Sequence, residues 1–482
     1  MILVWMIAIL LITGILCWLI ARWNPVVAKW IALLSVLADL GIISYLCWQY
    51  NITTADSWFI DYRVDWIPSF GISFHVAMDG LSLLMLLLTF FLGLLSVLCS
   101  WNEIKEKTGF YFFNLLWTLA GISGVFIAMD LFLFYFFWEV MLVPMYFLIA
   151  IWGDANRRYA AYKFFIFTQA GGLLMLLAIL ALYFIHAQQS GTYSFDYFSL
   201  VNTSLEPATA KWIMLGFLIA FLVKLPMVPF HNWLPDAHSE APTAGSLILA
   251  GLLLKTGAYG IIRFVLVLFP QASADIAWGA MLFGVIGIVY GAVLAFSQTD
   301  LKRLIAYTSV SHMGFVLLGI FAFQDMALQG VVMQMLTHGI STGALFVIAG
   351  ILKERLHTRD INQMGGLWTA MPAMGGVAMV FTMASLGLPM LGNFIAEFLI
   401  LLGTFPVSNA LTVIAAVGLV FAALYSLRMV QKVFLGPVAV NIPVKDLSAR
   451  ELTLMAALSI SIVALGLYPQ PVINMIKIVT YQ

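Results

Sequence analysis

The stretch FLVKLPMVPFHNWLPD, Phe221 to Asp236, places one lysine and two helix-breaking prolines inside an otherwise apolar run. A charge at the centre of a bilayer costs about 2.5–3.5 kcal/mol, so Lys224 is expensive there. Pro226 and Pro229 each lack the N–H that a helix uses, and a carbonyl freed in hydrocarbon must find another partner. The stretch therefore predicts an interrupted membrane helix that faces a polar interior.

The composition of the whole chain agrees with a membrane setting. Its 482 residues are 63% hydrophobic and 9% charged, with a mean hydropathy of +1.04. A soluble domain could not hide so much apolar surface, so we expect an all-α polytopic membrane protein. Cys17, Cys47 and Cys99 lie in separate apolar runs without a CxxC pair, which argues against a disulfide framework, an iron–sulfur cluster or a zinc site.

Apolar runs of 18 or more residues recur along the chain, and we count fourteen. They lie at about 2–21, 27–48, 79–100, 110–129, 131–151, 162–185, 211–230, 242–268, 275–297, 302–322, 327–351, 372–404, 409–434 and 451–474. The first run lacks a basic segment and a cleavage site, which indicates a retained span rather than a signal peptide. The longest loops, at about 50–78 and 186–210, are too poor in apolar residues for a core and are expected to cap one face.

The basic residues divide unevenly between the two sides that fourteen spans would create. One side holds Arg22, Lys29, Lys105, Lys107, Arg157, Arg158, Lys163, Lys302, Arg303, Lys353, Arg355, Arg359, Arg428, Lys432, Lys445 and Arg450. The other side holds Arg63, Lys211, Arg263 and Lys477. Because cytoplasmic loops collect Lys and Arg, we expect a multi-pass protein of a bacterial inner membrane with both termini on the periplasmic side.

The seventh run has a counterpart in the twelfth. Pro226 and Pro389 both stand in a Leu-Pro-Met context, the second within SLGLPMLGNFIAEF, so we expect two discontinuous helices. Spans that are five apart cross in opposite directions, which is typical of an inverted-topology repeat. We therefore expect one membrane domain that consists of spans 1–3 (1–105), two inverted five-helix repeats (110–268 and 275–434) and a last span (451–474). A plain packing kink is the alternative reading of such prolines.

Four ionisable residues stand out inside the expected spans as possible partners for one another: Glu139, Lys224, Lys255 and Glu397. Two acids and two bases can compensate for one another's burial. The first repeat would let Glu139 face Lys224, and Lys255 would be the next ionisable group along the membrane plane. A lysine whose carboxylate partner approaches and retreats changes its pKa and can carry a proton. The alternative is a permanent structural ion pair.

The tenth and eleventh spans add uncharged polar groups at helical spacing, which places them on one face of each helix. These are Thr308, Ser311 and His312 in the tenth span, and Gln334, His338 and Thr342 in the eleventh. A hydrated stripe of such groups can relay protons, with a histidine as carrier because histidine titrates near neutral pH. The alternative is that the stripe only joins the helices by hydrogen bonds.

His231, Asp236, His238 and Glu240 cluster in the segment HNWLPDAHSEAPTAG. Nothing in their spacing enforces a closed coordination sphere, so no metal site is expected. The segment is better interpreted as an amphipathic interfacial turn with a proton-entry or a structural role, in which His231 and His238 are the candidate entry residues. Asp39, in the second span, has two interpretations: a partner for a neighbouring subunit, or a residue exposed to a water defect.

Five segments resemble the antiporter-like membrane subunits of bacterial respiratory complex I. They are DGLSLLMLLLTFFLG, FWEVMLVPMYFLIAIWG, KLPMVPFHNWLPDAHSEAPTAGSLILAGLLLKTGAYGIIRF, TDLKRLIAYTSVSHMGF and GNFIAEFLILLG. The resemblance spans essentially the whole chain. Glu397 favours the M type, the counterpart of mitochondrial chain 4, because the L and N types and the multisubunit sodium/proton antiporters typically carry a lysine in this helix.

The resemblance implies a proton channel of two half-channels, driven by quinone reduction elsewhere in an NADH:quinone oxidoreductase. It implies that Glu139 tunes Lys224 and that Lys255 is the central relay. It further implies that His312 and His338 continue the polar axis to Glu397, the exit-side proton site.

The same resemblance implies that this chain binds no cofactor. FMN, iron–sulfur clusters and quinone would belong to partner subunits, among which the L- and N-type subunits are neighbours. The lipid bilayer and protons are the other expected partners, and nucleic acid is not one. A subunit of a multisubunit cation/proton antiporter and a structural spacer of the membrane arm remain the alternatives.

Overall fold

The computed structural model describes residues 1–49, 58–437 and 444–476, so the start of the first long loop (50–57) and Lys477 lie outside the described residues. In the described part, thirteen helices are long and apolar enough to cross a membrane. They are α1 (Ile2–Ile20), α2 (Pro25–Gln49), α3 (Gly80–Glu103), α4 (Thr108–Ile127), α5 (Leu131–Trp152), α6 (Arg157–Ser190), α8 (Pro207–Lys224), the segment Thr243–Leu268, α13 (Pro270–Ser297), α14 (Leu301–Ile320), α15 (Asp325–Leu356), α19 (Asn409–Val433) and α20 (Ala449–Leu467).

The twelfth expected span consists of two short helices, α17 (Pro372–Ser385) and α18 (Gly392–Thr404). Each is too short to cross a bilayer of about 30 Å at 1.5 Å per residue, but in sequence they complete a fourteenth crossing. The prediction of an all-α polytopic membrane protein is confirmed. Its division into two inverted repeats stays a prediction.

The segment Thr243–Leu268 is an unusual helix. It is assembled from α10 (Thr243–Ile248), α11 (Leu254–Gly260) and α12 (Leu266–Leu268), joined by two wide π-type turns, η2 (Leu249–Leu253) and η3 (Ile261–Val265). Such turns break the regular backbone hydrogen bonding and are frequent at functional sites. Lys255 lies directly after the first of them.

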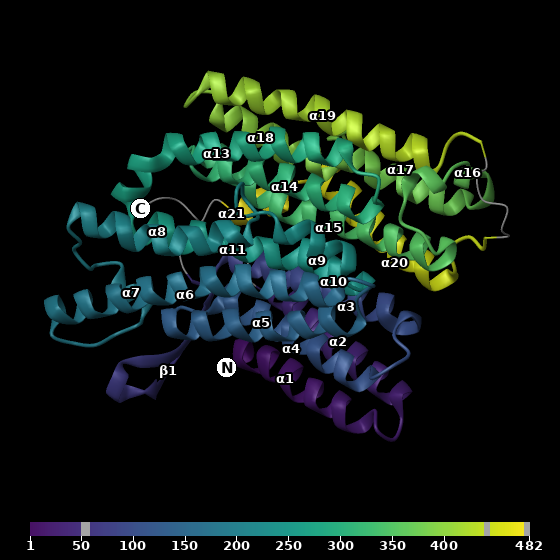
Figure 1. Cartoon of the computed structure of the whole chain (residues 1–482). Coiled ribbons are helices and arrows are strands. Elements are labelled where there is room, and N and C mark those ends of the chain that lie inside the picture. Colours follow the sequence, from purple (N-terminus) through teal and green to yellow (C-terminus); the bar gives the residue numbers. More distant parts are fainter. Residues whose placement is uncertain (50–57, 438–443, 477–482) are drawn as a thin grey trace.

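The long helices run side by side across the view in Figure 1, with the early helices in the lower half and the late ones in the upper half. α15 lies between them and packs against α3 and α10 on one side and against α14, α17, α18 and α20 on the other. It is buried along its whole membrane-crossing length. Polar side chains on α15 are therefore enclosed by protein and not by lipid.

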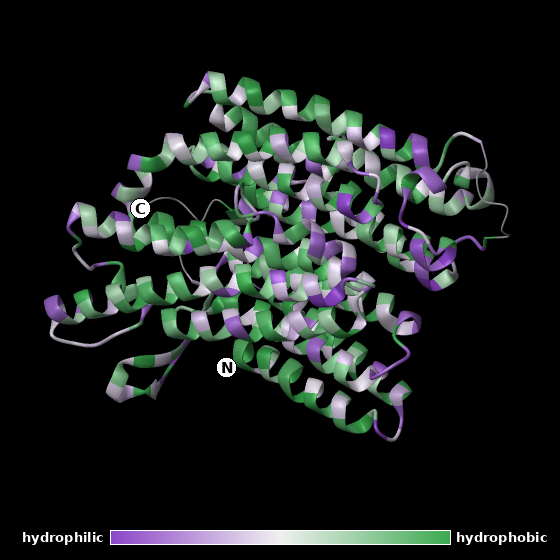
Figure 2. Cartoon of the chain, in the orientation of Figure 1, coloured by the Kyte–Doolittle hydropathy of each residue, from purple (hydrophilic) through white to green (hydrophobic). Residues whose placement is uncertain are grey.

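Hydrophilic residues gather at the end of the bundle where α9 (Trp233–Glu240), α10 and α16 (Leu367–Ala370) lie, as the purple segments of Figure 2 show. Arg359 joins three chain segments there. Its guanidinium contacts Asp154 after α5 at 3.1 Å, Glu240 of α9 at 3.3 Å and Asp300 before α14 at 3.0 Å, and Lys353 of α15 also contacts Asp154. We call this end of the molecule the basic face.

The opposite face carries a small cap, which is built from parts of both long loops. β1 (Ile60–Ile67) and β2 (Ile72–Met78) pair antiparallel around the short turn η1 (Pro68–Phe70), and α7 (Tyr197–Leu200) lies beside them. His75 of β2 binds Asp196 through Nδ1 at 2.5 Å and Asp61 through Nε2 at 2.9 Å. Burial alone would lower the pKa of His75, but the bonds and charges of the two carboxylates outweigh it and raise that pKa.

The His75–Asp196 pair predicts a pH-dependent stability of the cap. Because the folded pKa of His75 is raised, its contribution is complete below the unfolded value of 6.5 and is lost as the pH rises through the folded pKa. We expect the melting temperature of the purified protein in detergent to exceed that of His75→Gln by more at pH 6 than at pH 9. An equal difference at the two pH values would contradict a charged pair.

Close packing of α4 on α5 gives a second prediction. A Cβ atom on Gly121 would collide with the backbone nitrogen of Met141, which cannot move independently of its helix. We expect Gly121→Ala to destabilise the protein by about 1–3 kcal/mol in thermal unfolding. Gly279→Ala on α13 is the matched control, since among the described residues no heavy atom lies within 4 Å of the position that its Cβ would take. Equal melting temperatures of the two variants would contradict this packing.

Candidate functional site

The first helix break lies between Lys224, the last residue of α8, and Trp233, the first residue of α9. Pro226 and Pro229 both fall within it. The backbone N–H of Met227 donates to the carbonyl of Leu222 at 3.0 Å, the carbonyl that Pro226 deprives of its regular partner. Lys224 thus ends a helix in which the Leu222 carbonyl accepts its hydrogen bond from a residue within the break.

The second break separates Ser385, at the end of α17, from Gly392, at the start of α18, and contains Pro389. Gly387 and Met390 adopt left-handed conformations there, with φ of +78° and +76°. A left-handed backbone is easy for glycine and costs energy for methionine, so the chain direction is fixed on both sides of the proline. Both spans that contain a Leu-Pro-Met sequence are interrupted.

Lys224 is fully buried and lies over aromatic rings. Its Nζ is 5.0 Å from the centre of the Trp138 ring and 5.6 Å from that of Phe164. In the described parts of the chain, no hydrogen-bond partner reaches this Nζ. Glu139 interacts with Lys224 through its charge but accepts a hydrogen bond from Gln169 instead, at 3.3 Å. The expected close approach of Glu139 and Lys224 is a longer-range interaction here, because aromatic rings surround the ammonium group.

Lys255 has two direct partners. Its Nζ donates to the carbonyl of Ala250 in the wide turn η2, at 2.5 Å, and lies 2.7 Å from Nδ1 of His338 on α15. Lys255 and His338 are both fully buried. The wide turn is thus what brings a backbone acceptor to the lysine, while its ammonium group contacts a titratable ring on another helix.

The row continues from His338 to Glu397. The rings of His338 and His312 have their centres 5.6 Å apart. His312 Nδ1 lies 3.0 Å from Glu397 Oε1, and Gln334 Nε2 lies 3.4 Å from the same oxygen. Four helices therefore supply one row of titratable groups. Lys255 comes from α11, His338 from α15, His312 from α14 and Glu397 from α18. We call the residues Lys255, His338, His312 and Glu397 the polar row.

The two hydroxyls expected on the tenth span both donate to backbone carbonyls, and their part in a proton relay stays a prediction. Thr308 Oγ1 donates to the Ile305 carbonyl of its own helix at 2.7 Å, and Ser311 Oγ donates to the Ile288 carbonyl of α13 at 2.9 Å. The Ser311 bond joins two helices, as the structural interpretation of the stripe predicts. Thr342 of α15 is buried, and its hydroxyl meets no partner among the described residues.

The segment with α9 does not form an interfacial turn, so that prediction is wrong. α9 is almost entirely buried, because it packs against α6, α10 and α14. Asp236 binds Lys163 at 2.6 Å and Arg303 at 2.8 Å, whereas Glu240 binds Arg359. The acids thus pair with basic residues of other segments and do not converge with the histidines on a common point.

His231 and His238 occupy separate apolar surroundings. The His231 ring lies edge-on to Tyr290, with the centres 5.5 Å apart, and His238 stacks on Phe346 with the centres 4.3 Å apart. Their four ring nitrogens are buried and reach no hydrogen-bond partner within the described ranges. The part of both rings in proton entry therefore stays a prediction.

Three residues near Glu397 and His312 were not anticipated from the sequence. Ser385 Oγ and the Tyr425 hydroxyl lie 3.4 Å and 3.5 Å from His312 Nε2, and Asn393 donates to Ser341 Oγ at 3.1 Å. Asn393 stands four residues before Glu397, so helical spacing could have identified it. Ser385 and Tyr425 come from α17 and α19, and nothing in their local sequence indicated the contact.

Asp39 of α2 is fully buried within this chain, and its carboxylate oxygens meet no partner in the described residues. Asp39 was expected either to contact a neighbouring subunit or to be exposed to a water defect. Both expectations are wrong, because side chains of this chain cover Asp39 completely. It lies in α2, outside the helices that form the polar row, and we have no physical account of its burial.

Comparison with known proteins gives a consistent result. The family model of the NADH:quinone oxidoreductase/Mrp antiporter transmembrane family matches residues 128–423. The chain is 55% identical to NADH-quinone oxidoreductase subunit M of Pseudomonas aeruginosa, over 98% of this chain and 96% of that one. It is 52% identical to subunit M of Escherichia coli K12, with the same coverage of both chains.

Solved structures agree. A chain of respiratory complex I from Thermus thermophilus with bound NADH matches with a TM-score of 0.89 and 28% identity, over 99% of both chains. A chain of the Mrp complex from a Dietzia species has the same fold, with a TM-score of 0.88 and 21% identity, over 99% of this chain and 96% of that one. This chain therefore belongs to the NADH:quinone oxidoreductase/Mrp antiporter transmembrane family and, within it, to the group of subunit M.

Proposed function

We propose that this chain is a proton-translocating subunit in the membrane arm of a bacterial NADH:quinone oxidoreductase, and that the polar row carries the protons. The observation that supports this most is the contact series from Lys255 through His338 and His312 to Glu397, buried in an apolar bundle. An intramembrane ionisable residue is costly and is by default a functional candidate.

A proton can move along this row by short steps. The 2.7 Å contact allows Lys255 to give a proton to Nδ1 of His338, and the 3.0 Å contact allows His312 to give one to Glu397. Between the two rings, water is the natural carrier. His338 Nε2 and Gln334 Oε1 are buried beside this gap without a partner in the described chain, and such atoms are usually hydrated.

Lys224 supplies the control at the start of the path. A cation over aromatic faces is stabilised by the ring quadrupoles, but it cannot share a proton with them. Movement of Glu139 toward Lys224 would favour the charged lysine, and its retreat would release the proton. A change of two pKa units is worth about 2.7 kcal/mol, close to the 2.3 kcal/mol per charge for a membrane potential of 100 mV.

The energy source would lie in other subunits. We infer that FMN, iron–sulfur clusters and quinone are bound there, and that the L- and N-type subunits adjoin this chain in the membrane. The basic face would lie in the cytoplasm, because cytoplasmic loops collect Lys and Arg, and both termini would then be periplasmic.

The alternative functions fit the chain less well. A cation/proton antiporter subunit shares the fold, but the relatives that are 52–55% identical are all subunit M proteins. A structural spacer would have no use for Lys224, Lys255 and Glu397 in its interior, because each destabilises an apolar core unless it is compensated.

Substitution of Lys224 tests the proposal. We expect Lys224→Ala in the assembled complex to lower proton pumping coupled to NADH oxidation by about a hundredfold, because positioned proton carriers contribute factors of about 10² or more. Lys211→Ala is the matched control, because Lys211 is an exposed lysine of the same helix paired with Asp275. Full pumping by Lys224→Ala in a well-assembled complex would refute the proposal.

Glu397 offers a test of the exit side. Glu397→Gln retains an oxygen for the bond to His312 but cannot bind and release a proton, so we expect pumping to fall as in Lys224→Ala. Glu397→Lys restores a titratable group and should keep part of the activity. The measurement is proton uptake per NADH oxidised in reconstituted vesicles. If Glu397→Gln pumped as well as the unaltered protein, a titratable group at this position would not be required.

A further inference from the structure

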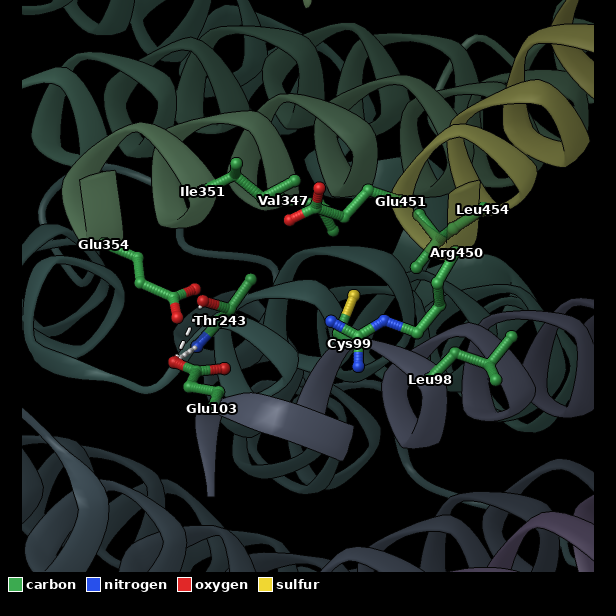
Figure 3. A pocket seen from close by; sticks show the side chains of 10 residues that line it. All are labelled: Leu98, Cys99, Glu103, Thr243, Val347, Ile351, Glu354, Arg450, Glu451 and Leu454. Carbon is green, nitrogen blue, oxygen red and sulfur yellow. Dashed lines mark hydrogen bonds between the residues drawn. The ribbon is translucent and has the colours of Figure 1, made fainter. Parts of the chain in front are cut away.

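A small cavity lies at the basic face, apart from the polar row (Figure 3). Its polar walls come from four helices: Glu103 at the end of α3, Thr243 at the start of α10, Glu354 of α15, and Arg450 and Glu451 of α20. It offers about 30 Å³ to the centres of water molecules, and one water needs roughly 10–15 Å³. Glu354 is exposed, so the wall that it forms reaches solvent.

The two oxygens of the Glu103 carboxylate have different surroundings. Oε1 accepts hydrogen bonds from the backbone N–H and the hydroxyl of Thr243, both at 3.0 Å. Oε2 is buried and finds no partner in the residues that the structure describes. Figure 3 shows the carboxylates of Glu103 and Glu354 on either side of Thr243, with Glu451 across the cavity. One oxygen of Glu103 is thus fixed, and the other can take up a proton.

Two buried basic residues lie between Glu103 and the polar row. Lys302 at the start of α14 is 1% exposed, and its Nζ donates to the Ala241 carbonyl at 2.8 Å. It is close enough to Glu103 to interact through its charge, and His238 is similarly close to both Lys302 and Lys255. His238 is fully buried, and in the described chain neither of its ring nitrogens has a partner.

We propose that Glu103 is the proton entrance from the basic face, and that Lys302 and His238 pass the proton to Lys255. The carboxylate binds a proton from water in the cavity. The ammonium group of Lys302 gives a proton to the neutral His238 ring and regains one from Glu103. The imidazolium then protonates Lys255, once that amine has given its own proton to His338. Each of these steps would move one proton across intervening water, and no electron is transferred.

The competing explanation is that Glu103 only caps α10 by binding Thr243. The two roles differ in what they require. A cap needs an oxygen acceptor, which glutamine also supplies, whereas an entrance needs a group that binds and releases a proton. Arg450 lines the cavity beside the three acids, and Glu451 pairs with Arg355 at 2.6 Å, so Glu103 and Glu354 are the acids there without a salt-bridge partner among the described residues.

The experiment compares variants of the whole complex in reconstituted vesicles, and it rests on the proposed function. We expect Glu103→Gln to lose roughly half or more of the proton pumping that Lys224→Ala loses, since proton carriers contribute large factors to rate. Glu103→Asp should recover part of the loss, and formate should restore pumping in Glu103→Ala by replacing the missing acid. Glu106→Gln is the matched control, because Glu106 is an exposed acid just beyond α3 that does not line the cavity.

The outcomes separate the two proposals. If Lys224→Ala pumps poorly while Glu103→Gln pumps normally, the entrance is wrong and the proposed function stands. If Glu103→Gln is impaired but neither aspartate nor formate restores pumping, the loss does not follow the acid at this position, and the entrance is likewise wrong. If Lys224→Ala pumps normally, the proposed function itself fails. Assembly of each variant is checked by NADH oxidation with an artificial electron acceptor.

Discussion

The cost of keeping ionisable groups away from water is the constraint on which this structure depends. Lys224, Lys255 and Glu397 can remain in an apolar bundle only where other groups offset that cost. The chain places Lys224 at an interrupted helix end over aromatic rings, and it places Glu397 against His312 and Gln334. It also uses the wide turn before Lys255, whose Ala250 carbonyl binds the ammonium group. Irregular backbone in a membrane is tolerated only where protein or water surrounds it, so the polar row and the interruptions require each other.

The two lysines meet the same constraint in different ways. Lys224 lies over aromatic rings with a carboxylate at longer range, whereas Lys255 has a carbonyl and an imidazole in direct contact. Rings stabilise a cation without accepting its proton, whereas an imidazole nitrogen can accept it. The first environment suits a group whose charge is set by a movable partner. The second suits a group that passes its proton on.

Both ends of the bundle are held by ion pairs that cross between segments. At the basic face, Arg359 contacts acids from three segments that are far apart in the sequence. At the opposite face, His75 joins the hairpin to Asp196, at the start of α7. These contacts tie together helix ends that are far apart in the sequence. The cavity beside Glu103 lies within the basic end, where protons from solvent would first meet a buried acid.

The sequence by itself determined the membrane fold, the order and bounds of nearly all spans and the two interrupted helices, because apolar length and proline act locally. It also identified all four residues of the polar row, since an ionisable residue in an apolar run is conspicuous. Only the tertiary structure decided which groups touch. It placed rings rather than Glu139 against Lys224, buried α9 instead of leaving it at the interface, enclosed Asp39, and brought Ser385 and Tyr425 to His312. Such contacts join helices that are distant in the sequence, and their geometry depends on how helix faces pack, which no local pattern encodes.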